Sequence, residues 1–361
     1  FPAFSLGWVL SNEKFLGNLA PTLSHLKLRY GWGQNGNSQI DNYAAFQMYE
    51  FLYDYNSVWD WNWGTAYDFT GQGGNLPSGF RRTQRGNPNL KWETTSQHNI
   101  GVDFGFLNST LNGSFDYYLK YTKDILMKPG YVATLGEGAG MWLNGADIRN
   151  RGFELSLNYQ NNIGTVGTNI GVVLAHNKQR IIKVPDVVIN NFAGDGKDDN
   201  ILGRSRNSLY GYIADGLFQT QEEIDNAPAQ VGAAPGRIRY RDINGPDGKP
   251  DGKIDNYDRT WIGVQDPKLE YGFNIGLTWK NFDFNLFFNG ILGKDLNVQS
   301  WKSWTIYSLG TVGENYDVRL LDAWTPTNTG SKIPAISVNN YNEENRFSTY
   351  YVESGAYLKI R

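Results

Sequence analysis

The feature that most restricts the fold is a strict alternation of apolar and polar residues over long runs. Residues 271–279 read Tyr-Gly-Phe-Asn-Ile-Gly-Leu-Thr-Trp, and the same period occurs at 26–33, 100–106, 111–122 and 153–159. A period of two places the apolar set on one face of a β-strand. Ordinary strands have about 5–6 residues, whereas a strand that crosses a bilayer needs about 9–11. The runs therefore predict long strands with one apolar face.

The connections between these runs alternate between short and long. Tight turns such as 280–281 join two strands into a pair, and long segments separate the pairs at 125–150, 178–267 and 293 to about 350. Outer-membrane barrels have tight periplasmic turns and long extracellular loops, and loops of this length are uncommon in compact soluble domains. The sequence thus predicts an all-β fold, a sector of about nine strands from a large antiparallel transmembrane barrel.

Composition agrees with a large β-protein that has many turns. The chain contains 42 Gly and 15% aromatic residues, while charged residues make up 19%, below the usual level of about 25%. The net charge of −3 lacks the basic footprint of a nucleic-acid-binding protein. Because this footprint is missing, we expect no nucleic-acid partner. The absence of Cys excludes disulfides and thiolate metal sites.

Pattern alone leaves two other architectures open, a soluble secreted β-rich protein that binds or cleaves glycans and a passive porin. Catalysis has little support, because His25, His98 and His176 are scattered and none has metal-ligand spacing with another. No nucleophile elbow, phosphate loop or dinucleotide fingerprint is present. We therefore expect no catalytic residues and no enzymatic activity.

An acidic segment at 242–258 contains the residue types of a calcium loop. Calcium prefers oxygen ligands at alternating positions, a glycine at the sharp turn and a late carboxylate. The candidate ligands are Asp242, Asn244, Asp251, Asp255 and Asp258. The first two fit only if the residues between Gly245 and Pro250 loop out. The alternative is a cluster of polar turns that holds no ion.

Two long segments, 34–92 and 293 to about 350, are rich in aromatic residues. Flat aromatic faces with polar neighbours suit the C–H faces and hydroxyls of sugars. The candidate substrate-binding residues are Trp59, Trp61, Trp63, Tyr67, Trp301 and Trp304. The alternative is packing or an interfacial girdle, because Trp and Tyr are enriched at membrane boundaries.

Short helices are predicted at two places in the connecting segments. Ser11 and Thr220 are the candidate N-cap residues, and Glu223 has the capping-box spacing from Thr220. Both helices are expected to be structural parts of loops.

Motifs along the whole chain carry a family resemblance. The most specific is Asn-Pro-Asn-Leu-Lys-Trp-Glu at 87–93, just before a predicted strand. Others lie at 1–8, 26–37, 150–154, 211–219, 242–263, 324–326 and 354–361, the last reading Ser-Gly-Ala-Tyr-Leu-Lys-Ile-Arg. Together they resemble the SusC/RagA family of TonB-dependent outer-membrane transporters of Bacteroidota.

The resemblance implies that residues 1–361 are part of a single plugged barrel domain of about 22 strands. The N-terminal plug, the TonB box and the last strands are then expected outside this sequence. It also implies a place in the outer membrane among lipid, energy from the TonB–ExbB–ExbD complex, and a SusD-like surface lipoprotein as a lid. Substrates of the family are mostly oligosaccharides, and some members import peptides. We therefore expect import of an oligosaccharide, with a peptide as the alternative.

Overall fold

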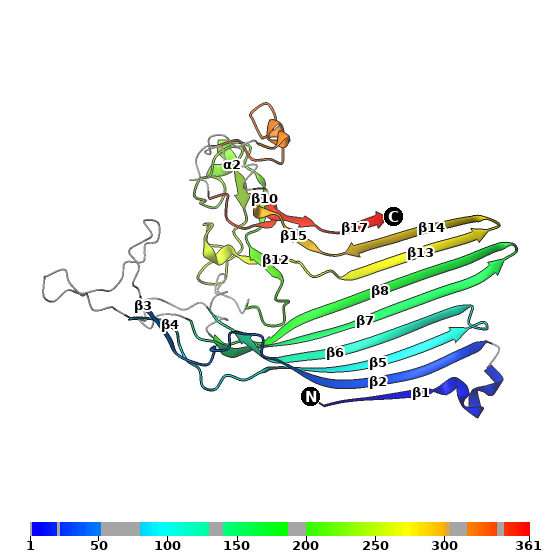
Figure 1. Cartoon of the computed structure of the whole chain (residues 1–361). Coiled ribbons are helices and arrows are strands. Elements are labelled where there is room, and N and C mark those ends of the chain that lie inside the picture. Colours follow the sequence, from blue (N-terminus) through cyan, green and yellow to red (C-terminus); the bar gives the residue numbers. More distant parts are fainter. Residues whose placement is uncertain are drawn as a thin grey trace.

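Nine strands form one antiparallel sheet in the computed structural model, which describes residues 2–19, 22–51, 80–129, 140–186, 200–300, 302, 316–337 and 343–361 (Figure 1). The order is β1-β2-β5-β6-β7-β8-β13-β14-β17. The strands are β1 Ala3–Val9, β2 Leu23–Asn37, β5 Glu93–Phe106, β6 Leu111–Met127, β7 Leu143–Ile163, β8 Val166–Lys183, β13 Leu269–Trp279, β14 Phe282–Leu292 and β17 Tyr357–Ile360. Their number and antiparallel order confirm the predicted barrel sector.

The register of the sheet separates apolar from polar side chains. Phe273 of β13 is paired with Phe288 of β14, and their rings stack with centroids 4.1 Å apart. On the other face, Ser114 of β6 is paired with Ser156 of β7. Because directly paired residues of an antiparallel sheet share a face, each alternating run contributes to one continuous apolar face and one polar face. This confirms the period-two prediction.

The apolar face of the sheet is widely exposed in the described part of the chain. Its large exposed side chains include Phe4, Leu6, Trp8, Ile100, Trp279, Phe282 and Phe284. An apolar surface of this extent marks a contact with a membrane or another protein, and it corresponds to the lipid-facing side of a barrel wall. No helix in the described ranges is long and apolar enough to cross a membrane.

The polar face carries a triad of charged side chains near the N-terminal strands. Arg29 Nη2 of β2 lies 2.7 Å from Asp103 Oδ1 of β5 and 2.9 Å from Asp116 Oδ2 of β6. Gly101 of β5 is the cross-strand partner of Arg29, and a Cβ on Gly101 would come within 2.6 Å of Arg29 Cζ. Glycine at 101 therefore leaves the space in which one guanidinium joins three strands.

The predicted tight turns are confirmed, but one long connection is shorter than expected. Within the predicted segment 125–150, β6 continues to Met127 and β7 already begins at Leu143. The pairing of β6 with β7 shifts register between Thr122 and Ile125, and Asp124 has a φ of +57°. A bulge interrupts the apolar–polar period, so the pattern ends in the sequence before the strand ends in space.

The longest connections contain their own small elements at one end of the long strands (Figure 1). They are β9 Ser208–Gly211, β10 Ala214–Leu217, α2 Gln221–Asp225, β11 Ile238–Tyr240, η5 Asn256–Asp258, β12 Thr260–Val264, β15 Asp295–Asn297, η6 Val318–Asp322, η8 Thr349–Tyr351 and β16 Val352–Ser354. A further hairpin consists of β3 Met48–Phe51 and β4 Phe80–Gln84. We call the described residues of 200–264 and 295–354 the outer module, since long connections of such barrels are extracellular.

The two predicted short helices have different outcomes. Thr220 is the N-cap of α2 and its side chain accepts from the Glu223 N–H, while Glu223 Oε2 accepts from Gln219 N at 2.7 Å. The Ser11 N-cap is wrong, because Ser11 lies inside the 3-10 helix η1 Leu10–Asn12, whose N-cap is Val9 without a side-chain bond. A second 3-10 helix, η2 Lys14–Leu19, follows it.

Candidate functional site

The outer module has a hydrophobic core built from both of its loops. Tyr212, Ile238, Tyr240 and Ile254 come from the connection between β8 and β13, and Trp324 comes from the connection between β14 and β17. Residues of this core are at most 8% exposed. The segments that were predicted only as long loops therefore fold together as one packed unit.

A buried ion pair joins the two loops of the module. Arg237 Nη1 lies 3.0 Å from Glu344 Oε2, with the two side chains 9% and 3% exposed. The other oxygen of Glu344 accepts from the backbone N–H of Ile238 at 2.9 Å. Burial raises the pKa of the Glu344 carboxyl, and these donors act against that rise. The pair therefore depends on both partners being present, because either residue alone would be a buried charge without a counter-charge.

Backbone hydrogen bonds and an arginine also join the two loops, in the region around Tyr212 that we call the junction. Tyr212 N donates to Phe347 O, and Thr349 N donates to Tyr212 O, each at 2.9 Å. The Arg346 guanidinium lies over the rings of Tyr212 and Tyr240, 5.0 and 5.2 Å from their centroids. A cation over an aromatic face is attracted by the ring quadrupole. The junction is thus fixed by backbone and side chains together.

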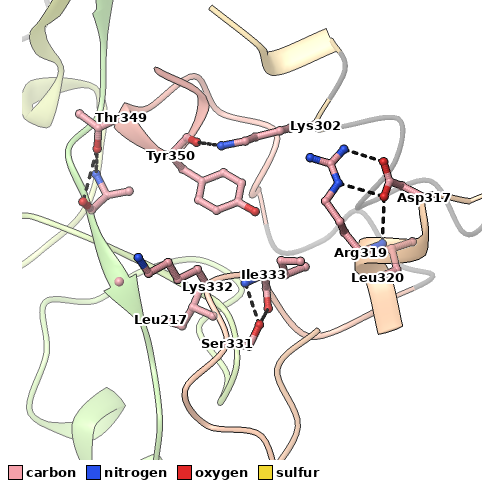
Figure 2. A pocket seen from close by; sticks show the side chains of 12 residues that line it. Leu217, Lys302, Asp317, Arg319, Leu320, Ser331, Lys332, Ile333, Thr349 and Tyr350 are labelled. Atoms are coloured by element: carbon pink, nitrogen blue, oxygen red, sulfur yellow. Dashed lines mark hydrogen bonds and ion pairs between the residues drawn. The ribbon is translucent and has the colours of Figure 1, made fainter. Parts of the chain in front are cut away.

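A cavity of about 480 Å³ lies at this junction (Figure 2). It is lined by β10, by η6 with the preceding Asp317, by residues 331–333, by Thr349 and Tyr350 of η8, and by Lys302. The volume lies within the range of about 300–1,000 Å³ that is usual for ligand pockets. Leu217, Ile333 and the ring of Tyr350 supply apolar surface (Figure 2).

Three of the lining side chains are cationic and one is a carboxylate. Lys302 Nζ lies 4.7 Å from the centroid of the Tyr350 ring and 2.7 Å from Glu353 Oε1. Arg319 donates from Nε to Asp317 Oδ1 at 2.9 Å, and this arginine lowers the pKa of Asp317 to about 2. Lys332 is exposed. The cavity combines an aromatic wall with an excess of positive charge, which suits a ligand that carries an anionic group.

None of the aromatic residues that the sequence suggested for substrate contact can be placed. Trp59, Trp61, Trp63, Tyr67, Trp301 and Trp304 lie outside the described residues. Conversely, sequence patterns missed Lys332 and Tyr350, which are brought together from separate segments of one loop. Neither belongs to a periodic run, so no local signal distinguishes them from other loop residues.

In the acidic segment 242–258, Asp258 is fully buried and organises the backbone. Its Oδ1 accepts from Ile243 N at 2.8 Å and from Asn244 N at 3.3 Å, and its Oδ2 accepts from Asp255 N at 2.8 Å. Desolvation raises the pKa of the Asp258 carboxyl, and these three N–H groups oppose the rise. The oxygens of this residue are therefore engaged by the protein itself.

The other candidate ligands also bind backbone groups. Asp255 Oδ1 accepts from Tyr257 N at 2.8 Å, Asp251 Oδ1 from Lys253 N at 3.1 Å, and Asp242 Oδ2 from Gly252 N at 2.7 Å. Across the part of the chain that the structure describes, no three or more His, Cys, Asp or Glu side chains form a group that could hold a metal. Calcium binding by the five predicted residues stays a prediction.

Comparison with known proteins gives consistent matches along the chain. The family model described as TonB dependent receptor-like, beta-barrel matches residues 1–340. TonB-dependent receptor P3 of Formosa agariphila is 29% identical over all of this chain and 34% of its own length. TonB-dependent receptor SusC of Bacteroides thetaiotaomicron is 28% identical over 79% of this chain and 26% of its own. The chain thus spans about a third of the length of such relatives.

Among solved structures, one described as the structure of the RagAB peptide transporter superposes with a TM-score of 0.71 at 22% identity. The match covers 99% of this chain and 36% of that chain. At this level of identity the likeness concerns the fold, and it agrees with the nine-stranded sheet.

Proposed function

The chain belongs to the TonB-dependent receptor β-barrels of the SusC/RagA type, which lie in the outer membrane, and from this premise we propose that it serves the energised import of a nutrient. The observation that carries the proposal is the sheet itself, with one face apolar and exposed and the other polar. A wall of this kind separates lipid from an aqueous lumen. A soluble secreted protein, one of the two other architectures that the pattern left open, is excluded by the membership.

The proposed cargo is an oligosaccharide with at least one acidic sugar unit. The support comes from the cavity of the outer module, where the Tyr350 ring offers a flat apolar face. There Lys302, Arg319 and Lys332 outnumber the two carboxylates paired with them, Asp317 and Glu353. A sugar ring would stack on the aromatic face, and its carboxylate or sulfate would meet the cations. A peptide is the second candidate, because the structural neighbour RagAB is described as a peptide transporter.

Replacing Lys332 with glutamine is expected to weaken binding of an acidic oligosaccharide about tenfold, which equals about 1.4 kcal/mol. The change removes one cation from the cavity without adding bulk. Affinity is to be measured by calorimetry on the full-length protein, with acidic and neutral oligosaccharides and acidic peptides side by side. Lys183→Gln, at the end of β8 and outside the cavity lining, is the control. Equal loss in both variants, or tighter binding of the peptides, would reject the acidic-glycan assignment.

The aromatic segment provides a separate test of substrate contact. Replacing Trp59, Trp61 and Trp63 together with alanine is expected to reduce oligosaccharide affinity by at least tenfold, because each ring contributes stacking area. Equilibrium binding and the heat-modifiable migration of the folded barrel are measured together, so that a folding defect is recognised. Unaltered binding in a folded protein would reject substrate contact and would indicate that these residues serve packing or the interfacial girdle.

The partners proposed for import are a SusD-like lipoprotein that closes the outer face and the TonB–ExbB–ExbD complex that supplies energy. The support is the similarity to SusC and to RagAB. Affinity purification of the full-length protein from detergent-solubilised outer membranes is expected to recover the lipoprotein, and uptake is expected to stop when the proton gradient is collapsed. In this proposal the protein carries out no covalent chemistry on its cargo. Uptake that persists without the gradient would instead indicate a passive pore.

A further inference from the structure

Within the part of the chain that the structure describes, the side-chain amide of one buried asparagine in the outer module has no hydrogen-bond partner. Asn244 is 1% exposed, and neither its Oδ1 nor its Nδ2 has a hydrogen-bond partner among the described residues. Leaving a buried amide unpaired loses the hydrogen bonds that it had with water. Native proteins contain few such groups, and an ion is one of the explanations for them.

The side chain of Asn244 is directed into the turn that follows it. Its Oδ1 lies 3.9 Å from the position that a Cβ on Gly248 would occupy. Gly248 and Gly252 have φ values of +74° and +83°, which allow the chain to fold back tightly here. The turn between 244 and 252 therefore encloses the unpaired amide.

Other oxygens surround the same turn. Asp242 Oδ1 is buried and has no hydrogen-bond partner in the described ranges, while its Oδ2 accepts from Gly252 N. A Cβ on Gly245 would come within 2.8 Å of Lys249 O and 3.0 Å of Asp251 Cγ. A carboxylate oxygen, an amide oxygen, a backbone carbonyl and a second carboxylate thus border one short loop.

We propose that this turn binds a calcium ion through Asp242 Oδ1, Asn244 Oδ1 and Asp251, together with backbone carbonyl oxygen and water. Calcium accepts six to eight oxygen ligands in flexible geometry and uses carboxylates, amides and carbonyls together. Two carboxylates balance its charge, so the site needs no third acidic residue. Magnesium fits less well because it demands a regular octahedron and keeps its own water.

The proposed ligand set differs from the one suggested by spacing along the sequence. Asp258 is left out because its two oxygens already accept three backbone N–H groups. Asp255 is left out because it caps η5, where its side chain accepts from Tyr257 N. Asp258 holds the backbone N–H groups of Ile243 and Asn244, and Asp255 holds the start of η5. The unpaired groups, and not the late carboxylates, mark the position of the ion.

Calcium bound here would order a segment that is joined to the module core. Ala229 N donates to Gly252 O at 2.8 Å, and Ile254 N donates to Ala229 O at 2.9 Å. Ile254 in turn belongs to the hydrophobic core with Ile238 and Tyr240. The ion would therefore act as a structural clamp, and binding would be visible as slower exchange of backbone amides.

The first experiment follows hydrogen exchange in the full-length wild-type protein after chelation and after addition of calcium or magnesium. Calcium is expected to slow exchange across 242–254 at least fivefold, and magnesium at the same concentration is expected to have little effect. Because no variant is needed, the result does not depend on whether a substituted loop folds. Identical exchange with and without calcium would overturn the proposal.

The second experiment compares calcium affinity between variants by calorimetry. Asp242→Asn and Asn244→Ala are each expected to weaken the site at least tenfold. Asp247→Asn is the matched control, since Asp247 is an exposed carboxylate in the same turn and is expected to change affinity less than threefold. If Asn244→Leu instead raised the thermal stability in calcium-saturated protein, Asn244 would be only a strained core residue and the site would be rejected.

Discussion

Arginine in place of Phe273 is expected to lower the free energy of unfolding of the barrel by about 2–4 kcal/mol. Phe273 lies near the middle of β13, on the exposed apolar face, and stacks on Phe288. A guanidinium there would have to enter the hydrocarbon layer close to its midplane, and the aromatic contact with β14 would be lost as well. The change is measured from denaturant titrations of the full-length protein folded into lipid vesicles.

The neighbouring position provides the control for this experiment. Asn274 follows Phe273 in β13, and its side chain belongs to the polar face, where it lies beside Gly171 of β8. Asn274→Arg introduces the same side chain at the same depth and is expected to cost less than about 1 kcal/mol, because a polar face in contact with water tolerates substitution as other surfaces do. Equal costs at both positions, or a larger cost for Asn274→Arg, would contradict the assignment of the two faces.

Glu344→Ala is expected to lower the local stability of the outer module by about 3 kcal/mol, because it leaves the Arg237 charge buried without its carboxylate. Arg237 has further contacts, so we expect the lower end of the usual range for a broken buried pair. The loss is local to the module, since the sheet does not depend on this pair. Hydrogen exchange is expected to accelerate in β11 and η8 and to stay unchanged in β13.

Glu222→Ala serves as the comparison for Glu344→Ala. Glu222 is an exposed carboxylate on α2 within the same module, and removing it should leave exchange in β11 within about twofold. Exposed charges contribute little to stability, typically about 0–1 kcal/mol. If both substitutions loosened β11 to the same extent, the ion pair between the two loops would not be the feature that holds them together.

The sheet could be predicted from the sequence because its information is local and periodic. Residues 271–279 and 282–292 show their two faces and their turn without any knowledge of the rest of the chain. The same reasoning failed beyond Thr122, where a bulge in β6 breaks the period, and at Ser11, where the chain forms a 3-10 helix with no side-chain cap. Local deviations of this kind leave no trace in an alternation of apolar and polar residues.

The cavity and the acidic segment show a different limit. Tyr350, Lys332 and Leu217 meet only because two loops share one core, and sequence spacing carries no information about that contact. Asp258 has the spacing of a metal ligand, but burial turns it into an acceptor of backbone N–H groups. Sequence therefore predicts which functional groups these loops contain, whereas the burial and contacts of each side chain determine what it binds.

The shared core of the outer module has a consequence for how such proteins can diversify. Glu344 and Trp324 from one loop complete a structure whose other half, including Arg237 and Gln219, belongs to the loop before it. Recombination that replaced one loop alone would pair it with a loop whose core-facing side chains are not complementary to its own. The two loops are thus expected to be inherited as a single cassette, and attempts to graft a new specificity onto this barrel should exchange both at once.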